Sequence, residues 1–164
     1  MNFPEYYEFS FPVKIISGHT ALNKLPVELA QAGLSRPLVI TDPGVGKAGL
    51  LEVFLNAFAE SEITIGAIFD QTPPESSTLV VNKIADLFRE KNCDSLIALG
   101  GGSVIDTTKG VNILVSHDSN DINQFRGADI LTGPLKPFYV VPTTAGTGSE
   151  ATNTAVIQDL EKGV

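Results

Sequence analysis

Several features are scarce in this sequence, and each scarcity excludes a class of protein. The 164 residues include one cysteine, Cys93, so an intrachain disulfide and a cysteine-based zinc site are both excluded. No apolar run approaches the roughly 18 residues that a membrane-spanning helix needs. The acidic start of the chain, residues 1–5, lacks the pattern of a signal peptide. These absences predict a cytoplasmic protein without a membrane partner.

Basic residues are scarce as well. Lys and Arg number 11 against 19 Asp and Glu, which gives a formal net charge of -8. Such a chain repels a nucleic-acid backbone, whereas a nucleotide stays compatible because local backbone dipoles can hold a phosphate. Hydrophobic residues make up 43% of the sequence, and a chain of this length buries about 70% of its unfolded surface. We therefore expect one folded domain over residues 1–164.

Short apolar runs alternate with segments of helical periodicity. The apolar runs lack strict alternation, which is typical of strands that are buried on both faces of a parallel sheet. We expect strands over 37–41, 63–69, 95–99 and 138–141. We expect helices from Pro26 to Gly33, over 50–58, over 80–88 and after Gly102. This order predicts an α/β fold with a doubly wound, mostly parallel sheet.

The carboxyl end of the sequence has the pattern of a strand without its partner. Residues 154–158 have a strand pattern and residues 159–163 a turn pattern, so a return strand would begin at Val164. Natural domains avoid leaving the backbone groups of such a strand unpaired. We therefore expect the chain to be the front part of a longer protein, cut within a hairpin.

The first of two glycine clusters runs from Gly44 to Gly49 and has the spacing G-x-G-x-x-G. With Asp70 at the end of the next strand, it matches a Rossmann fingerprint, in which the acid binds the adenine ribose. The match is weak, because 15 glycines in 164 residues produce it by chance fairly often. The favoured interpretation of this cluster is an ordinary glycine-rich turn into a helix.

The second glycine cluster, Gly100 to Gly102, directly follows an expected strand. Three glycines remove every Cβ from the strand-to-helix turn, so a pyrophosphate can approach the main chain closely. The first amides of the next helix have no partner within that helix and point at such an anion. Ser103 can donate its hydroxyl to a phosphate or cap the helix. Asp106 fits equally well as the acid of a capping box and as a site residue.

A third segment, from Pro142 to Glu150, follows the last expected strand and is rich in threonine and glycine. Ligands of open α/β sheets bind outside the carboxyl ends of the strands. Asp42, the second glycine cluster and Thr143 to Thr147 all fall at that edge. This convergence predicts a ligand site more strongly than any one of the three segments.

Two runs in combination resemble the amino-terminal half of the iron-containing (group III) alcohol dehydrogenases: Gly100 to Lys109 and Pro142 to Glu150. These enzymes are akin to glycerol dehydrogenase and dehydroquinate synthase. Segments 11–18 and 41–45 also sit where the family has matching segments, so the resemblance spans nearly the whole chain. It implies a Rossmann-like amino-terminal domain of the dehydroquinate synthase-like fold. It also implies an all-helical second domain, which would follow Val164 and is absent from this sequence.

The resemblance implies that this domain binds NAD or NADP, with the pyrophosphate over the second glycine cluster. It places Asp42, rather than Asp70, near the adenine ribose. A carboxylate there would accept a hydrogen bond from a 2′-hydroxyl and repel a 2′-phosphate, so NAD is expected over NADP. The expected cofactor-binding residues are Asp42, Gly101, Gly102, Ser103, Asp106, Thr143, Thr144, Thr147 and Thr154.

In this family a divalent metal, usually iron or zinc, is held by one aspartate and three histidines of the second domain. His19 and His117 are the two histidines of this chain, and neither matches a family ligand, so both stay unassigned. The complete protein is expected to be an oxidoreductase in which the metal polarises the oxygen of a small alcohol or aldehyde. Family members are often dimers or larger. The 164-residue chain alone is expected to bind NAD weakly and to turn over no alcohol.

Three alternatives stay open. The protein could be a relative of glycerol dehydrogenase or of the dehydroquinate synthases, which use NAD transiently, although the full run from Thr143 to Glu150 favours the alcohol dehydrogenases. It could be a dinucleotide sensor without catalysis. It could also use the cluster at Gly44 as a Rossmann site, in which case Asp70→Ala, but not Asp42→Ala, would remove NAD binding.

Overall fold

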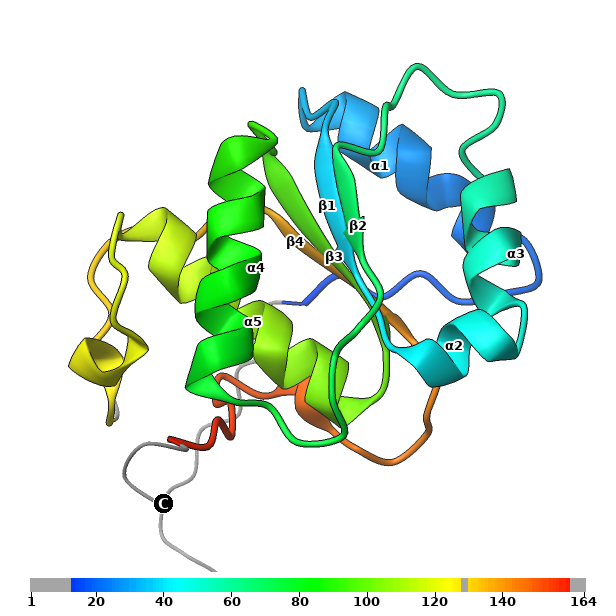
Figure 1. Cartoon of the computed structure of the whole chain (residues 1–164). Coiled ribbons are helices and arrows are strands. Elements are labelled where there is room, and N and C mark those ends of the chain that lie inside the picture. Colours follow the sequence, from blue (N-terminus) through cyan, green and yellow to red (C-terminus); the bar gives the residue numbers. More distant parts are fainter. Residues whose placement is uncertain (1–12, 128–129, 160–164) are drawn as a thin grey trace, which may run out of the picture.

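Four parallel strands form one sheet in the computed structural model, which describes residues 13–127 and 130–159. The strands are β1 (Pro37–Ile40), β2 (Ala67–Phe69), β3 (Ser95–Gly100) and β4 (Phe138–Pro142). Their order is β2-β1-β3-β4 (Figure 1). The register pairs Ile40 with Phe69 and Ala98, and Gly100 with Pro142. The carboxyl ends of the strands therefore meet at one edge of the sheet, as the sequence predicts.

Helices cover both faces of this sheet (Figure 1). One face carries α1 (Leu25–Gln31), α2 (Pro43–Lys47) and α3 (Leu50–Asn56), and the other carries α4 (Thr78–Glu90) and α5 (Gly102–Ser116). Short 3-10 helices cover Leu22–Lys24, Ile122–Phe125 and Ser149–Ala151. The predicted α/β class and doubly wound parallel sheet are confirmed. No helix within the described ranges combines the length and apolar character that crossing a bilayer requires.

β3 is one of the two inner strands, and its burial explains why its sequence is apolar without alternation. All six of its residues are buried. Leu96 and Ala98 pack in the core beneath α4 and α5, whereas Ile97 and Leu99 pack in the core on the side of α1 and α3. Both faces of the strand are therefore withdrawn from water, and each position contributes to one of two hydrophobic cores.

The predicted strand over 63–69 is shorter in the structure, where it covers Ala67–Phe69. Backbone bonds continue beyond the assigned strand, since Gly66 N donates to Pro37 O at 2.9 Å. The predicted helix over 50–58 ends at Asn56 and continues as turns. These differences concern the ends of elements, where periodicity carries the least information.

The predicted strand over 154–158 is wrong. This segment is irregular, and its one ladder contact is an isolated parallel bridge between Gln158 and Ser77. Side chains of α5 bind its backbone instead: Asp106 Oδ2 accepts from Val156 N at 3.1 Å. The predicted turn over 159–163 falls, apart from its first residue, outside the described residues.

The single cysteine yields a first testable prediction. Cys93 follows α4 with 8% of its surface exposed, and burial raises the pKa of its thiol to about 11, with Arg36 opposing the rise. The folded state therefore holds this proton more tightly than the unfolded chain, whose thiol has the ordinary value of 9.0. Stability should fall as the pH rises from 9 to 11.

We also expect iodoacetamide at pH 8 to alkylate Cys93 at least about 100-fold more slowly in the native chain than in urea, because access requires opening of the core. Mass spectrometry of quenched samples measures both rates. Equal rates would show that the thiol is accessible in the native state.

Candidate functional site

The glycine-rich turn, Gly100 to Gly102, joins β3 to α5 at the carboxyl edge of the sheet. Gly101 is the N-cap of α5, with extended backbone (φ -92°, ψ -165°) and no side-chain cap. The first amides of this 15-residue helix have no acceptor within it, and the helix dipole adds positive partial charge there. The turn therefore presents uncapped NH groups beside a main chain without Cβ atoms, which is an arrangement suited to an anion.

The capping box, one of the two alternatives left open for Ser103 and Asp106, is not formed. The helix begins at Gly102, so both residues lie inside α5 and neither caps it. The Ser103 hydroxyl donates to the carbonyl of Pro74, and its own carbonyl accepts from Ser76 Oγ at 2.9 Å. Ser103 is thus turned toward the connection between β2 and α4, and a phosphate would compete with Pro74 for its hydroxyl.

The threonine loop, residues 143–148, lies directly on the glycine-rich turn. Thr143 N donates to Gly100 O at 3.0 Å. A Cβ built on Gly101 would come within 2.9 Å of Thr144 Oγ1, and one built on Gly102 would lie 3.5 Å from the nearest atom of Thr147. The side chains of 143–147 are exposed. The structure thus brings the second glycine cluster and the predicted threonines together.

Two residues of α5, one turn apart, bind the segment that follows this loop. Asp106 accepts from the Ser149 hydroxyl through Oδ1 and from Val156 N through Oδ2 at 3.1 Å. Lys109 Nζ lies 3.6 Å from Asp106 Oδ1 and donates to Thr154 O at 2.7 Å. Both carboxylate oxygens of Asp106 are therefore engaged by the protein itself. Thr154 joins this network through its carbonyl oxygen.

Lys109 is the residue that sequence reasoning missed. Burial lowers the pKa of its ammonium group, and the charge of Asp106 opposes this shift. The signal in the sequence was the spacing of three residues between an acid and a base, which puts both on one face of a helix. No sequence pattern indicated that this face would meet residues 149–156.

Asp42 lies at the end of β1, next to β3 in the sheet, and caps α2. Its Oδ1 accepts from Gly44 N at 2.7 Å and from Val45 N at 3.1 Å. Both bonds use the same oxygen, so the cap leaves Oδ2 for a further donor. The side chain is half-buried.

The first glycine cluster forms a helix instead of a phosphate loop. Gly44 and Gly46 lie within α2, and Gly49, with φ 75°, is the N-cap of α3. The first amides of α2 already bind the carboxylate of Asp42. The exposed Asp70 accepts a hydrogen bond from its neighbour Gln71. The structure favours the ordinary turn over the Rossmann alternative.

Neither histidine lies at this edge in a ligand cluster. His19 is exposed, and His117 caps the far end of α5, where its ring lies 5.0 Å from that of Phe125. Across 13–127 and 130–159, no three His, Cys, Asp or Glu side chains gather closely enough to hold a metal ion.

The fold is an α/β domain whose glycine-rich turn is suited to an anion, and comparison with known proteins identifies its family. The model of the family "Iron-containing alcohol dehydrogenase" matches residues 12–164. The chain belongs to the iron-containing alcohol dehydrogenases, and the resemblance seen in its motifs is confirmed.

Individual relatives agree with this assignment. The choline dehydrogenase of Bacillus subtilis is 34% identical over 160 residues, which are 96% of this chain and 40% of that protein. The NAD-dependent methanol dehydrogenase of Bacillus methanolicus is 34% identical over 95% of this chain and 40% of its own length. The solved alcohol dehydrogenase from Oenococcus oeni superimposes with a TM-score of 0.89 at 30% identity, over 97% of this chain and 42% of that one. The chain thus spans about two fifths of the length of these relatives.

Proposed function

We propose that the chain, residues 1–164, is the dinucleotide-binding domain of an NAD-dependent oxidoreductase that interconverts a small alcohol and its aldehyde or ketone. One observation carries the proposal: an uncapped helix N-terminus, preceded by a turn of three glycines, lies under a loop of exposed threonines. This arrangement supplies NH donors, hydroxyl donors and space for a main-chain approach. NH donors and a close main-chain approach are what dinucleotide-binding turns use for a diphosphate, and hydroxyl groups can add further hydrogen bonds.

The residues of the turn fit the diphosphate of NAD. At Gly101 a Cβ would already lie 2.9 Å from Thr144 Oγ1, so a bulkier residue would fill the space between the turn and the threonine loop. In this proposal the amides after Gly101 bind phosphate oxygens, and the hydroxyl of Ser103 exchanges its bond to Pro74 O for a bond to a phosphate oxygen. Thr143, Thr144 and Thr147 border the dinucleotide from the loop. Binding energy gathered here would orient the nicotinamide, which supplies the hydride acceptor when NAD is bound.

Asp42 supports a preference for NAD over NADP. Its Oδ1 is fixed by the cap of α2, which leaves Oδ2 to accept a bond from the 2′-hydroxyl of the adenine ribose. A 2′-phosphate in the same place would meet a fixed negative charge. We assign no role in binding to Asp70.

We place the catalytic metal, iron or zinc, and most of the substrate pocket in parts of the complete protein beyond this chain. The length of the relatives supports this, because they are more than twice as long as this chain. Turnover then requires the complete protein. We further propose a cytoplasmic location, supported by the unpaired Cys93. We also propose a homo-oligomeric state, which the family resemblance implies.

The test is a ¹⁵N NMR titration of the chain with NADH. We expect a Kd on the order of 1 mM, about 4 kcal/mol of binding free energy, with the largest shifts at the amides of Gly102 and Ser103. Shifts confined to Gly44 and Gly46 would assign the cofactor to the other glycine cluster. No shifts at 10 mM NADH would overturn the proposal.

Asp42→Asn gives a second prediction, on cofactor choice. Asparagine keeps an oxygen for the cap of α2 and removes the charge, so NADPH should bind at least about tenfold more tightly than to the parent chain. Asp42→Gly should act the same way at a cost of a few tenths of a kcal/mol in the cap. Asp70→Asn is the matched control and should leave both affinities unchanged. An unchanged NADH/NADPH ratio in Asp42→Asn would remove the ribose role.

A further inference from the structure

The threonine loop is held by hydrogen bonds at both ends. The bond at its start joins two backbone groups, whereas the bond at its end joins two side chains. At its start, Thr143 N donates to Gly100 O, a backbone bond that continues the pairing of β4 with β3. At its end, Ser149 is buried and donates its hydroxyl to Asp106 of α5. The exposed side chains of 143–147 lie between these points. The position of the loop therefore depends on α5 side chains as well as on the sheet.

Lys109 adds further hydrogen bonds just beyond the end of the threonine loop. Its ammonium group donates to Thr154 O at 2.7 Å, to Thr152 Oγ1 at 3.1 Å and to Ser149 Oγ at 3.4 Å. Together with the bond from Val156 N to Asp106, these contacts bind the tether segment, residues 149–156, along one face of α5. Figure 1 shows this orange-to-red segment passing beside the amino-terminal half of α5.

The burial of the pair gives this contact its strength. The side chains of Lys109 and Asp106 expose 15% and 17% of their surface. Burying charged groups is costly unless each is paired and hydrogen-bonded. Apart from their contact with each other, the bonds of both groups in the described residues run to the tether segment. Undocking of the segment would leave two half-desolvated charges without these partners, so docking is favoured.

We infer that Asp106 and Lys109 are positioning residues for the dinucleotide: by holding the tether segment on α5, they keep the threonine loop over the glycine-rich turn. This inference rests on the proposed function for its ligand. It replaces the expectation that Asp106 contacts the cofactor itself, because both of its oxygens already bind Ser149 and Val156. It also gives Lys109 a role.

The first test measures the tether without any cofactor. In Asp106→Asn and in Lys109→Met, hydrogen exchange at the Val156 amide should accelerate at least about tenfold, while amides of β3 exchange as in the parent chain. Lys109→Arg should restore slow exchange, since a guanidinium keeps the charge and several donors. Unchanged exchange at Val156 in both variants would overturn the inference, even if NAD binds as proposed.

The second test separates positioning from direct contact. Asp106→Asn and Ser149→Ala should each weaken NADH binding about tenfold in the NMR titration. The double variant should lose no more affinity than the single variant with the larger loss. Such non-additivity is expected because Asp106 acts through Ser149. Additive losses would show that Asp106 contacts the cofactor independently, which would overturn the inference. An equal urea midpoint for all variants separates these losses from unfolding. Absence of NADH binding in the parent chain would instead refute the proposed function, and the exchange test would still stand.

Discussion

Gly101→Val is expected to remove detectable NADH binding while the chain stays folded. The backbone of Gly101 is extended, so a β-branched residue fits its dihedral angles without strain. Its side chain, however, would start 2.9 Å from Thr144 Oγ1 and fill the space where a diphosphate would meet the first amides of α5. We expect a loss of at least about 100-fold in affinity, or 2.7 kcal/mol, measured by NMR titration.

The other glycine cluster offers the matched control. A Cβ on Gly46 would meet nothing within 4 Å, and this residue lies within α2. Gly46→Ala should therefore leave NADH binding unchanged and stabilise the chain by up to about 1 kcal/mol through helix propensity. Loss of binding in Gly46→Ala with retention in Gly101→Val would move the site to the first cluster.

The sequence predicts the location of the candidate site because that location depends on where the strands end. Continuous apolar runs predict buried parallel strands, and the residues just after such strands must meet at one edge of the sheet. The second glycine cluster and the threonine loop were found in this way, and the structure places them in contact. Their detection needed only local patterns and one topological rule.

The parts that sequence reasoning got wrong depend on contacts between distant side chains and backbone. Residues 154–158 have β-branched and apolar residues, yet their backbone binds Asp106 and Lys109 instead of a strand. The capping-box alternative does not apply, because the N-cap of α5 is Gly101, two positions before Ser103. Neither outcome has a periodic signal, because residues 27 or more positions away supply the partners.

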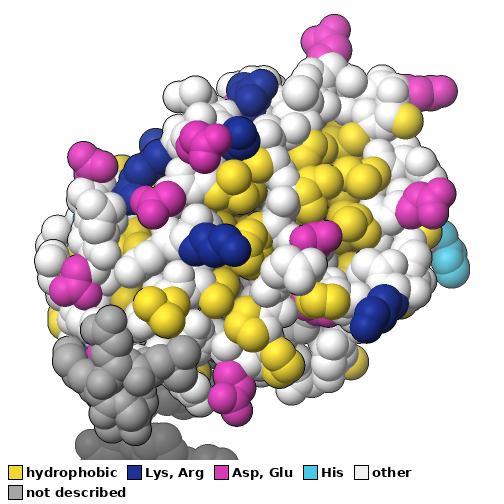
Figure 2. All heavy atoms as spheres, in the orientation of Figure 1, with side chains coloured by type: hydrophobic (Ala, Val, Ile, Leu, Met, Phe, Trp, Pro, Cys, Tyr) yellow, Lys and Arg dark blue, Asp and Glu magenta, His cyan; other side chains and the backbone are white. Residues whose placement is uncertain are grey.

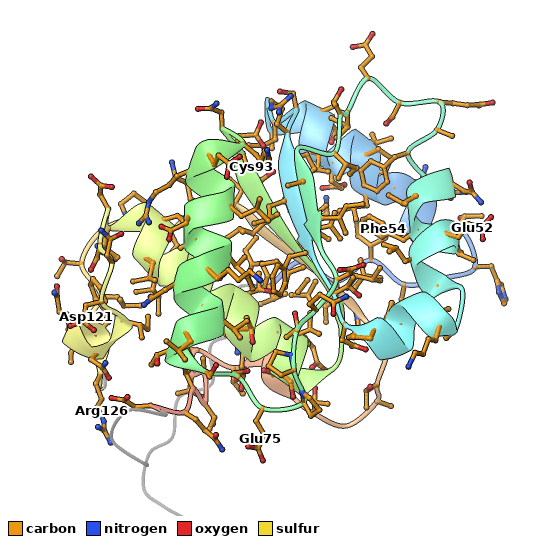
Figure 3. All side chains as sticks on the ribbon, in the orientation of Figure 1. Glu52, Phe54, Glu75, Cys93, Asp121 and Arg126 are labelled. Atoms are coloured by element: carbon orange, nitrogen blue, oxygen red, sulfur yellow. The ribbon has the colours of Figure 1, made fainter. Side chains whose placement is uncertain are left out.

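The second large effect is expected from a substitution in the hydrophobic core on the side of α1 and α3. Phe54 of α3 is completely buried and packs with Phe58, at 5.0 Å between ring centroids, and with Val39 and Leu99 of the sheet. Figure 3 shows its ring pointing from α3 toward the sheet, whereas Glu52 of the same helix points away. The same core includes Val45 of α2, the helix that Asp42 caps.

The other side of α3 faces solvent. Hydrophobic side chains gather on the face that carries β2 and α3, with acidic and basic side chains scattered around them (Figure 2). Val53 of α3 is 57% exposed, although its neighbour Phe54 is fully buried. A substitution on α3 therefore has an effect that depends on which side of the helix it alters.

Phe54→Ala is expected to lower the free energy of unfolding by about 3–5 kcal/mol, because it removes a fully buried ring and leaves a cavity in the core. This is a large part of the 5–15 kcal/mol that typically stabilises a domain. Urea denaturation followed by circular dichroism measures the change, and Glu52→Ala, on the exposed side, should stay within about 0.5 kcal/mol of the parent chain.

Phe54→Leu keeps the variant foldable, with a smaller expected loss of about 1–2 kcal/mol, and allows the NADH titration to be repeated. Val45 of α2 packs in the same core as Phe54, and Asp42 is the N-cap of α2. Looser packing of this core should therefore displace Asp42 and reduce NADH affinity. The reduction should be smaller in Asp42→Asn, where the ribose contact is already weakened. Equal reductions in both backgrounds would show that the α3 core stabilises the chain without positioning Asp42.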